Sequence, residues 1–192
     1  MPAWIVRARG SEAFVRFGND CRLAHVSPVS YLDGFSGDQE MSACRRACGL
    51  RKGRASEVGQ VYSITCMTAD RESVFACWRS ARLLVAQLRT MHESGDVESL
   101  AWVVMPDHVH WLFQLRKGDL ATVICRMKAR SSLAINRRNA TCGRLWQKGY
   151  YDRAMRREDD LRAAARYIIM NPVRAGLVEK VGDYPLWDAI WL

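Results

Sequence analysis

The sequence predicts an α+β fold of the ferredoxin-like type, in which helices pack on a central antiparallel sheet. Short segments rich in β-branched and aromatic residues alternate with longer segments whose apolar residues recur every three or four positions. A proline turn joins two adjacent apolar segments and predicts a central hairpin. The resulting order, β-α-β-β-α-β-α, is that of a ferredoxin-like sandwich. At 192 residues with 49% apolar and 26% charged residues, the chain has the composition of a globular protein.

The first predicted strand covers residues 61–68, which are mostly β-branched, aromatic or small. A helix of roughly five turns follows, and Gly95 and Asp96 mark its end. One face of this helix carries the apolar residues Phe75, Trp78, Ala81, Leu84, Val85, Leu88 and Met91. This periodicity predicts a helix that packs on the sheet.

The central hairpin is predicted from two apolar segments, 100–105 and 108–115, that are separated by Pro106 and Asp107. Because side chains alternate between the faces of a strand, the second segment sorts into two sets. One set is His108, His110 and Leu112, and the other is Val109, Trp111 and Phe113. Both histidines therefore share one face of the sheet.

The second half of the chain predicts two more helices and one strand. Asp119 is a candidate N-cap for the second helix, and residues 145–155 read as an irregular edge strand. Asp159 and Asp160 open the last helix, where acidic groups complement the helix dipole. Pro172 is expected to end that helix near Asn171.

Residues 1–50 show no sustained helical or strand period, and glycine and proline interrupt their apolar residues. We expect an irregular or disordered N-terminal extension, with Met41 as a candidate start, followed by a catalytic domain over 51–192. No apolar segment approaches the roughly 20 residues that a membrane span needs, so we expect a cytoplasmic protein without membrane contact.

The net charge of +9 is concentrated in residues 116–157, where 12 Lys and Arg residues face only two acids. Such a segment is often simply a solvated helix face, but the aromatic residues within it favour a surface for the phosphate backbone of a nucleic acid. The predicted contacts to DNA in this region are Arg126, Lys128, Arg130, Arg137, Arg138 and Lys148.

Four residues form a candidate catalytic group. His108 and His110, at i and i+2 on a strand, can bind one divalent ion from the same side, and the amide oxygen of Asn171 offers a harder ligand. Tyr167 lies four residues before Asn171, so one helix face would carry both. Each residue also has an ordinary structural reading: histidines on any strand, Asn171 as a helix C-cap before Pro172, and Tyr167 as an interface aromatic.

Three separated motifs, in order, carry a family resemblance. They are residues 101–113 (Ala-Trp-Val-Val-Met-Pro-Asp-His-Val-His-Trp-Leu-Phe), then 145–147 (Leu-Trp-Gln) with 150–152 (Tyr-Tyr-Asp), then 167–178 (Tyr-Ile-Ile-Met-Asn-Pro-Val-Arg-Ala-Gly-Leu-Val) with 183–185 (Asp-Tyr-Pro). Residues 50–192 as a whole resemble the REP-associated tyrosine transposases, a bacterial branch of the single-tyrosine HUH transposases.

The resemblance implies a role for each residue of the candidate group. His108, His110 and Asn171 would bind a divalent metal, Mg or Mn, and Tyr167 would be the nucleophile that forms a 5′-phosphotyrosine intermediate. The substrate would be single-stranded DNA folded into palindromic repeat hairpins, with a monomer as the expected state. The basic segment 49–54, with Arg51, Lys52 and Arg54, would contact the tetranucleotide beside the hairpin.

Two other functions fit parts of the sequence. A noncatalytic ferredoxin-like module would bind nucleic acid by stacking on exposed sheet aromatics and would need neither histidine nor Tyr167. A water-using metallophosphoesterase would need His108 and His110 but not the tyrosine. The dependence of cleavage on Tyr167 separates all three functions.

Overall fold

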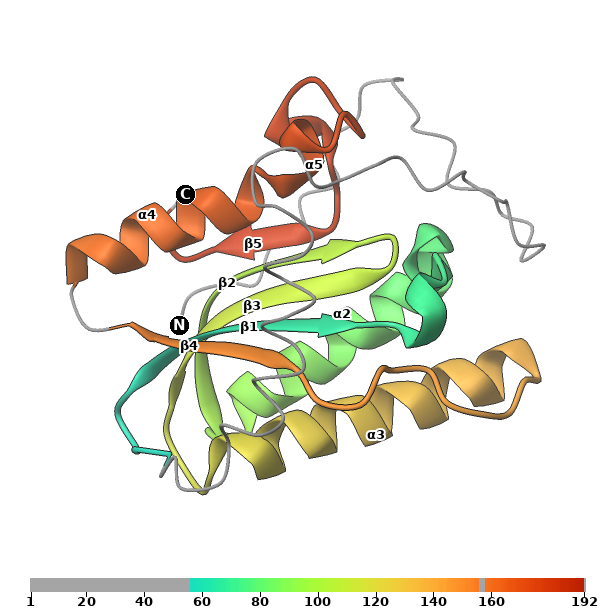
Figure 1. Cartoon of the computed structure of the whole chain (residues 1–192), viewed down its shortest axis with the longest axis horizontal. Coiled ribbons are helices and arrows are strands. Elements are labelled where there is room, and N and C mark those ends of the chain that lie inside the picture. The colour runs from blue at the N-terminus through green and yellow to red at the C-terminus, as the bar shows by residue number, and fades with distance from the viewer. Residues whose placement is uncertain (1–55, 156–157, 192) are drawn as a thin grey trace.

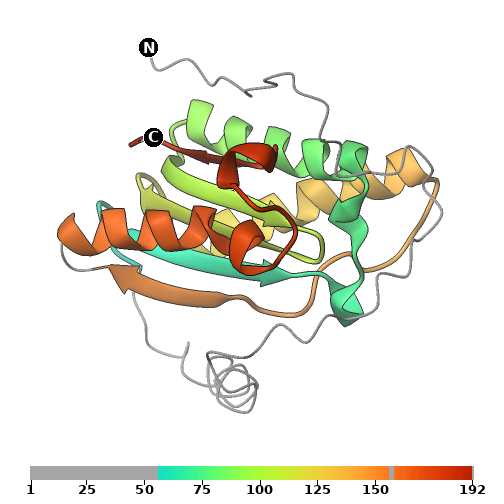
Figure 2. The same ribbon diagram turned by 90° about the horizontal axis from the view of Figure 1, so that it is seen from above.

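A computed structural model describes residues 56–155 and 158–191, which form a five-stranded antiparallel sheet with helices on both faces (Figures 1 and 2). The strand order is β4-β1-β3-β2-β5. The strands are β1 (Val61–Met67), β2 (Val97–Met105), β3 (His108–Leu115), β4 (Tyr151–Met155) and β5 (Trp187–Ala189). The helices are α2 (Trp78–Glu93), α3 (Leu120–Asn139), α4 (Glu158–Ile169) and α5 (Asn171–Arg174). Three short 3₁₀ helices, η1 (Ala69–Arg71), η2 (Val74–Ala76) and η3 (Val181–Asp183), complete the described elements.

The predicted α+β sandwich and the order of its elements are confirmed, and the short edge strand β5 is an addition. The predicted strand over 145–155 is shorter than expected, because β4 covers only Tyr151–Met155 while Trp146 makes an isolated bridge to Thr68. Helix α2 begins at Trp78, since Phe75 belongs to η2. The N-cap prediction is confirmed, as the Asp119 carboxylate accepts a hydrogen bond from the backbone N–H of Thr122 at 2.9 Å.

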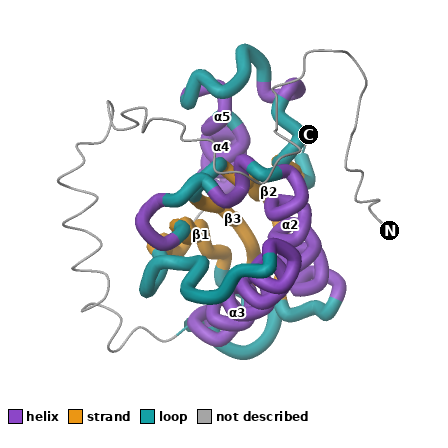
Figure 3. Tube along the Cα trace, turned by 90° about the vertical axis from the view of Figure 1, so that its right-hand side faces the viewer, coloured by secondary structure: helices purple, strands orange, loops and turns teal. Residues whose placement is uncertain are grey.

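Helices α2 and α3 lie together on one face of the sheet (Figure 3). Buried apolar side chains from both helices belong to the core. From β3, the core receives Val109, Trp111, Phe113 and Leu115, each at most 1% exposed. The Trp111 indole N–H donates to the Ser99 hydroxyl at 2.9 Å, so this buried polar group is satisfied. The period of two in the β3 sequence thus places its large apolar side chains against α2 and α3.

Helix α4 crosses the opposite face and runs toward the end of the sheet at which β2 turns into β3 (Figure 1). It packs through Ala165, Ile168 and Ile169, all buried. The segment after α5 returns to the sheet, where the Tyr184 hydroxyl donates to the backbone oxygen of Val104 at 2.6 Å and β5 pairs with β2. This second layer lies over the face that carries His108 and His110.

The predicted extension over residues 1–50, with the candidate start at Met41, lies outside the described residues, as do Arg51, Lys52 and Arg54. Among the helices that the structure describes, each is too short or too polar to span a bilayer.

Candidate active site on strand β3

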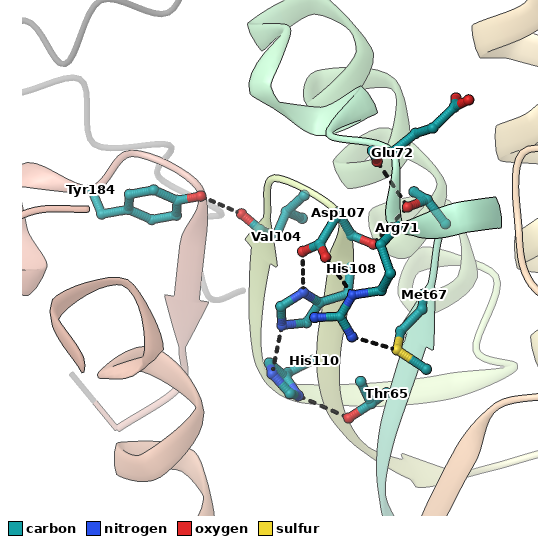
Figure 4. Close-up of polar contacts among 10 residues, drawn as sticks. Thr65, Met67, Arg71, Glu72, Val104, Asp107, His108, His110 and Tyr184 are labelled. Carbon is teal, nitrogen blue, oxygen red and sulfur yellow. Dashed lines mark hydrogen bonds and ion pairs between the residues drawn. The ribbon is translucent and has the colours of Figure 1, made fainter. Parts of the chain in front are cut away.

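Two histidines at the start of β3 point toward each other. His108 and His110 lie on the same face of the sheet, and their Nε2 atoms are 3.1 Å apart (Figure 4). The rings meet edge to face, with centroids 4.8 Å apart. The predicted placement of both imidazoles on one face is therefore confirmed.

A different neighbour holds the other nitrogen of each ring. The Nδ1 atom of His108 lies 2.6 Å from a carboxylate oxygen of Asp107, and the Nδ1 atom of His110 lies 2.8 Å from the hydroxyl of Thr65 on β1. A carboxylate only accepts, so the Nδ1 atom of His108 donates to Asp107, and a neutral His108 ring then has its lone pair on Nε2. The Thr65 hydroxyl both donates and accepts, so His110 can present either an N–H or a lone pair at Nε2.

The electrostatic environment favours the neutral form of His110 and the ionised form of Asp107. Burial is the main reason that the pKa of His110 lies well below its ordinary value, and the nearby charge of His108 lowers it further while that of Asp107 opposes the shift. The charges of Arg174 and Arg71 lower it too. Burial alone would raise the pKa of Asp107, but the hydrogen bond and charge of His108 and the charge of Arg71 together hold it below its ordinary value.

The paired nitrogens fit a divalent ion. Two ligands at right angles on an ion with bonds of about 2.1 Å lie about 3.0 Å apart, close to the 3.1 Å between the two Nε2 atoms. Metal-bound histidines usually donate the other ring N–H to a carboxylate or oxygen acceptor, which Asp107 and Thr65 supply. Among the described residues no cluster of three His, Cys, Asp or Glu side chains forms a metal site, so further ligands must be of other types.

Asn171 lies at the start of α5 and not, as expected, on the same helix as Tyr167. Tyr167 and Asn171 do not share a single helix, because α4 ends at Ile169 and Asn171 begins α5. The side-chain amide N–H groups of Asn171 donate to the backbone oxygens of Ile168 at 2.9 Å and Tyr167 at 3.2 Å. Asn171 thus caps the end of α4, as its alternative reading predicted, and its amide oxygen remains an acceptor.

Tyr167 is the accessible tyrosine of α4. Its side chain is 49% exposed, and the guanidinium carbon of Arg174 lies 4.1 Å from the centre of its ring. The structure disfavours two other tyrosines as nucleophiles, because both residues are buried and both hydroxyls have partners. The Tyr184 hydroxyl donates to the backbone oxygen of Val104, and the Tyr62 hydroxyl accepts from the N–H of Glu57. Arg174 is thus a charged neighbour shared by Tyr167 and His110.

The basic residues of α3 separate into two groups. Arg126 forms an ion pair with Asp96 at 2.6 Å, and the Lys128 ammonium donates to the backbone oxygens of Gln147 and Gly149. These two side chains, expected to face outward, instead fasten α3 to neighbouring segments and are half-buried. The remaining predicted DNA contacts in this region are exposed: Arg130, Arg137, Arg138 and Lys148.

Four residues of the site carry no role in the sequence prediction. Thr65 pairs with His110 across the β1–β3 register, a contact that a predicted strand pairing would reveal. Asp107 appears in the sequence only as a turn residue. Arg174 and Arg71 come from segments whose approach to the sheet no local pattern signals.

Comparisons with known proteins identify the family of the chain. The family model described as "Transposase IS200 like" matches residues 58–171, which include both histidines, Tyr167 and Asn171. The chain is similar to the REP-associated tyrosine transposase of Escherichia coli K12, with 33% identity over 116 residues, covering 56% of this chain and 67% of that relative. It also resembles the solved structure of a REP-associated tyrosine transposase bound to a REP hairpin, with a TM-score of 0.61 and 26% identity over 70% of this chain and 79% of that one.

Proposed function

Because this chain belongs to the IS200-like family of tyrosine transposases, which are DNA-cleaving enzymes, we propose that it cleaves and rejoins single-stranded DNA at palindromic repeat hairpins. The relative bound to a REP hairpin supports this substrate class. Family membership also disfavours the noncatalytic binding module. Such a module would need neither the two histidines nor Tyr167, and all three lie in the range that the family model matches.

One observation carries the proposal: the Nε2 atoms of His108 and His110 are 3.1 Å apart, and both Nδ1 atoms are already engaged. Two imidazole nitrogens so placed can serve as metal ligands, and we propose that they hold Mg or Mn together with the amide oxygen of Asn171. A bound divalent ion supplies Lewis acidity at the scissile phosphate. The chain itself orients the two imidazoles and the amide.

The proposed reaction is a transesterification on Tyr167. Its phenolic oxygen, after loss of the proton, attacks the phosphorus; a new P–O bond to the tyrosine forms as the bond to the 3′ oxygen breaks. The 3′ oxygen takes up a proton and leaves as a hydroxyl, and the 5′ phosphate stays on the enzyme. Arg174, 4.1 Å from the Tyr167 ring, is placed to stabilise negative charge that develops at the phosphate.

The DNA path proposed here follows the exposed basic residues at one end of the sheet. Arg137 and Arg138 lie in the last turn of α3, and Lys128 holds the backbone on both sides of Lys148. Trp146 bridges to Thr68, so this loop lies beside the end of β1 near His108. We propose that the hairpin contacts this end, with the basic segment 51–54 as a further contact. We also expect a cytoplasmic monomer.

The test is Tyr167→Phe in the full chain, with a REP-type hairpin carrying a label on its 3′ side. The 5′ phosphate becomes linked to the enzyme, so only this label reports the covalent adduct on a denaturing gel. We expect the variant to fold and bind the hairpin but to give neither nick nor adduct, because phenylalanine keeps the ring and lacks the attacking oxygen.

Matched controls are Tyr150→Phe and Tyr151→Phe, the other described tyrosines that are not fully buried. Each should retain the adduct. An adduct that persists in Tyr167→Phe would assign the nucleophile to another tyrosine. Cleavage without any adduct in the unaltered protein would identify water as the nucleophile and support the phosphoesterase instead.

A further inference from the structure

The backbone between β1 and α2 is strained beside the histidine pair. Asp70 and Arg71, consecutive in η1, have φ values of +52° and +57°. This left-handed conformation costs roughly 1–2 kcal/mol for each residue other than glycine. Strain of this kind persists where surrounding contacts enforce it, often at functional sites.

The strained segment is hydrogen-bonded to the β2–β3 turn on both sides of η1. The backbone N–H of Thr68 donates to the oxygen of Asp107 at 2.9 Å, and the N–H of Phe75 donates to the oxygen of Pro106 at 2.8 Å. Between these two anchors, the left-handed turn carries Arg71 back over the hairpin. Its Nε lies 2.7 Å from one oxygen of Asp107, and its Nη1 donates to the sulfur of Met67 at 2.9 Å (Figure 4).

Each oxygen of the Asp107 carboxylate consequently has its own partner. One oxygen faces Arg71, and the other lies 2.6 Å from the Nδ1 atom of His108. Asp107 lies in the β2–β3 turn and His108 is the first residue of β3, so this contact joins the turn to the strand. With both oxygens engaged, rotation of this group about its own bond would break one contact or the other.

We propose that Arg71 is a positioning residue for the metal centre: by fixing the Asp107 carboxylate, it sets the ring orientation and proton position of His108 and so presents Nε2 to the ion. The strained turn is then the means by which this guanidinium reaches the hairpin. The inference rests on the proposed function, because it assigns Arg71 to the ion held by His108 and His110.

Charge alone predicts the opposite effect. A guanidinium near a dication repels it, so an Arg71 that acted only through its charge would weaken metal binding. Removal of Arg71 should then strengthen binding, and replacement by lysine should leave it unchanged. A positioning role predicts weaker binding in both variants, since neither methionine nor lysine reproduces the planar group that faces Asp107.

The test is Mn²⁺ titration by calorimetry on the full chain carrying Arg71→Met, Asp107→Asn or both. Mutation of a residue hydrogen-bonded to a metal ligand typically lowers metal affinity by about 10–100-fold. Arg71 contacts Asp107 and not the ligand His108 itself, so we expect a loss at the lower end, about tenfold, for Arg71→Met. The double variant should bind no more weakly than Asp107→Asn, because Arg71 acts through that carboxylate. Arg71→Lys should also weaken binding.

Arg89→Met is the matched control: Arg89 is as exposed as Arg71 and pairs with a carboxylate, Glu93, but on α2. It should leave Mn²⁺ affinity unchanged, and thermal melting should show each variant folded. Unchanged or tighter Mn²⁺ binding by Arg71→Met, or additive losses in the double variant, would overturn the inference. Unchanged binding by His108→Ala/His110→Ala would instead overturn the proposed metal centre itself.

Discussion

The two faces of strand β3 differ in what their side chains contribute. Toward α2 and α3 the strand presents Trp111 and Phe113, fully buried and packed with ring centroids 4.2 Å apart. Toward α4 it presents His108 and His110, whose nitrogens face each other and whose other partners are polar. Adjacent side chains of β3 thus share a backbone but not an environment.

This difference indicates how the fold separates stability from chemistry. The face toward α2 and α3 excludes water, and each large apolar side chain buried there contributes about 1.5–3 kcal/mol. The face toward α4 keeps polar groups in a fixed array that an ion or a phosphate can complete. Substitutions on the face toward α2 and α3 should therefore lower the free energy of unfolding and spare activity. Substitutions on the face toward α4 should abolish activity and spare stability.

Loss of the imidazoles tests the site face and has the largest expected effect. We predict that His108→Ala and His110→Ala each abolish cleavage, because each removes one of the paired Nε2 atoms proposed to bind the metal. Excess chelator should abolish cleavage by the unaltered protein, because it removes the metal itself. Hairpin affinity should stay within a few fold, and the free energy of unfolding within about 1 kcal/mol. Gel cleavage assays and urea unfolding measure these quantities, and cleavage by a chelated sample would contradict the prediction.

Trp111→Ala tests the core face of the same strand. Truncation of a fully buried Trp typically costs about 3–5 kcal/mol, and here it also leaves the Ser99 hydroxyl without its donor. We predict a loss in this range by urea unfolding, while the protein that remains folded still forms the covalent adduct. A loss under 1 kcal/mol would show that the two faces are not specialised as described.

The sequence predicts the core face of β3 well because period-two alternation depends only on neighbouring residues. The same alternation also predicts that His108 and His110 lie together, which the structure confirms. The sequence fails where contacts come from distant segments. Arg71 reaches Asp107 through a left-handed turn that no glycine marks, and Arg174 meets Tyr167 only after the chain bends between α4 and α5.

The basic residues of α3 show a second limit. Helical spacing alone places Arg126 and Lys128 on a solvated face, yet tertiary partners hold both of them. Asp96 lies just before β2, and the oxygen of Gln147 lies in an irregular loop, so neither partner follows from the periodicity of the helix. Charge therefore predicts a nucleic-acid surface, and the structure indicates which of its cations are exposed.

Two sets of substitutions sharpen this distinction. Replacing the exposed residues Arg137, Arg138 and Lys148 with Ala should weaken hairpin binding and make the slope of log affinity against log salt shallower by about one per lost phosphate contact. Replacing Arg126 and Lys128 should instead lower the free energy of unfolding, because those cations hold Asp96 and the 147–149 loop. Equal salt slopes for the two sets would contradict the proposed DNA path.

The smallest expected effect concerns the end of α3, on the face away from the histidines. Ala140 adopts φ +52° and ψ +37° where its backbone N–H caps the helix by donating to the oxygen of Asn136. Glycine adopts this conformation without steric cost, so Ala140→Gly should raise the free energy of unfolding by about 1 kcal/mol. The same substitution at Ala134, inside α3, should lower it by about 1 kcal/mol, because glycine there only adds backbone freedom. Both variants should cleave the hairpin at the unaltered rate, since neither residue contacts the site. If Ala140→Gly lost stability, the left-handed cap would not be the source of strain, and if it lost cleavage, the two faces of the sheet would be coupled through α3.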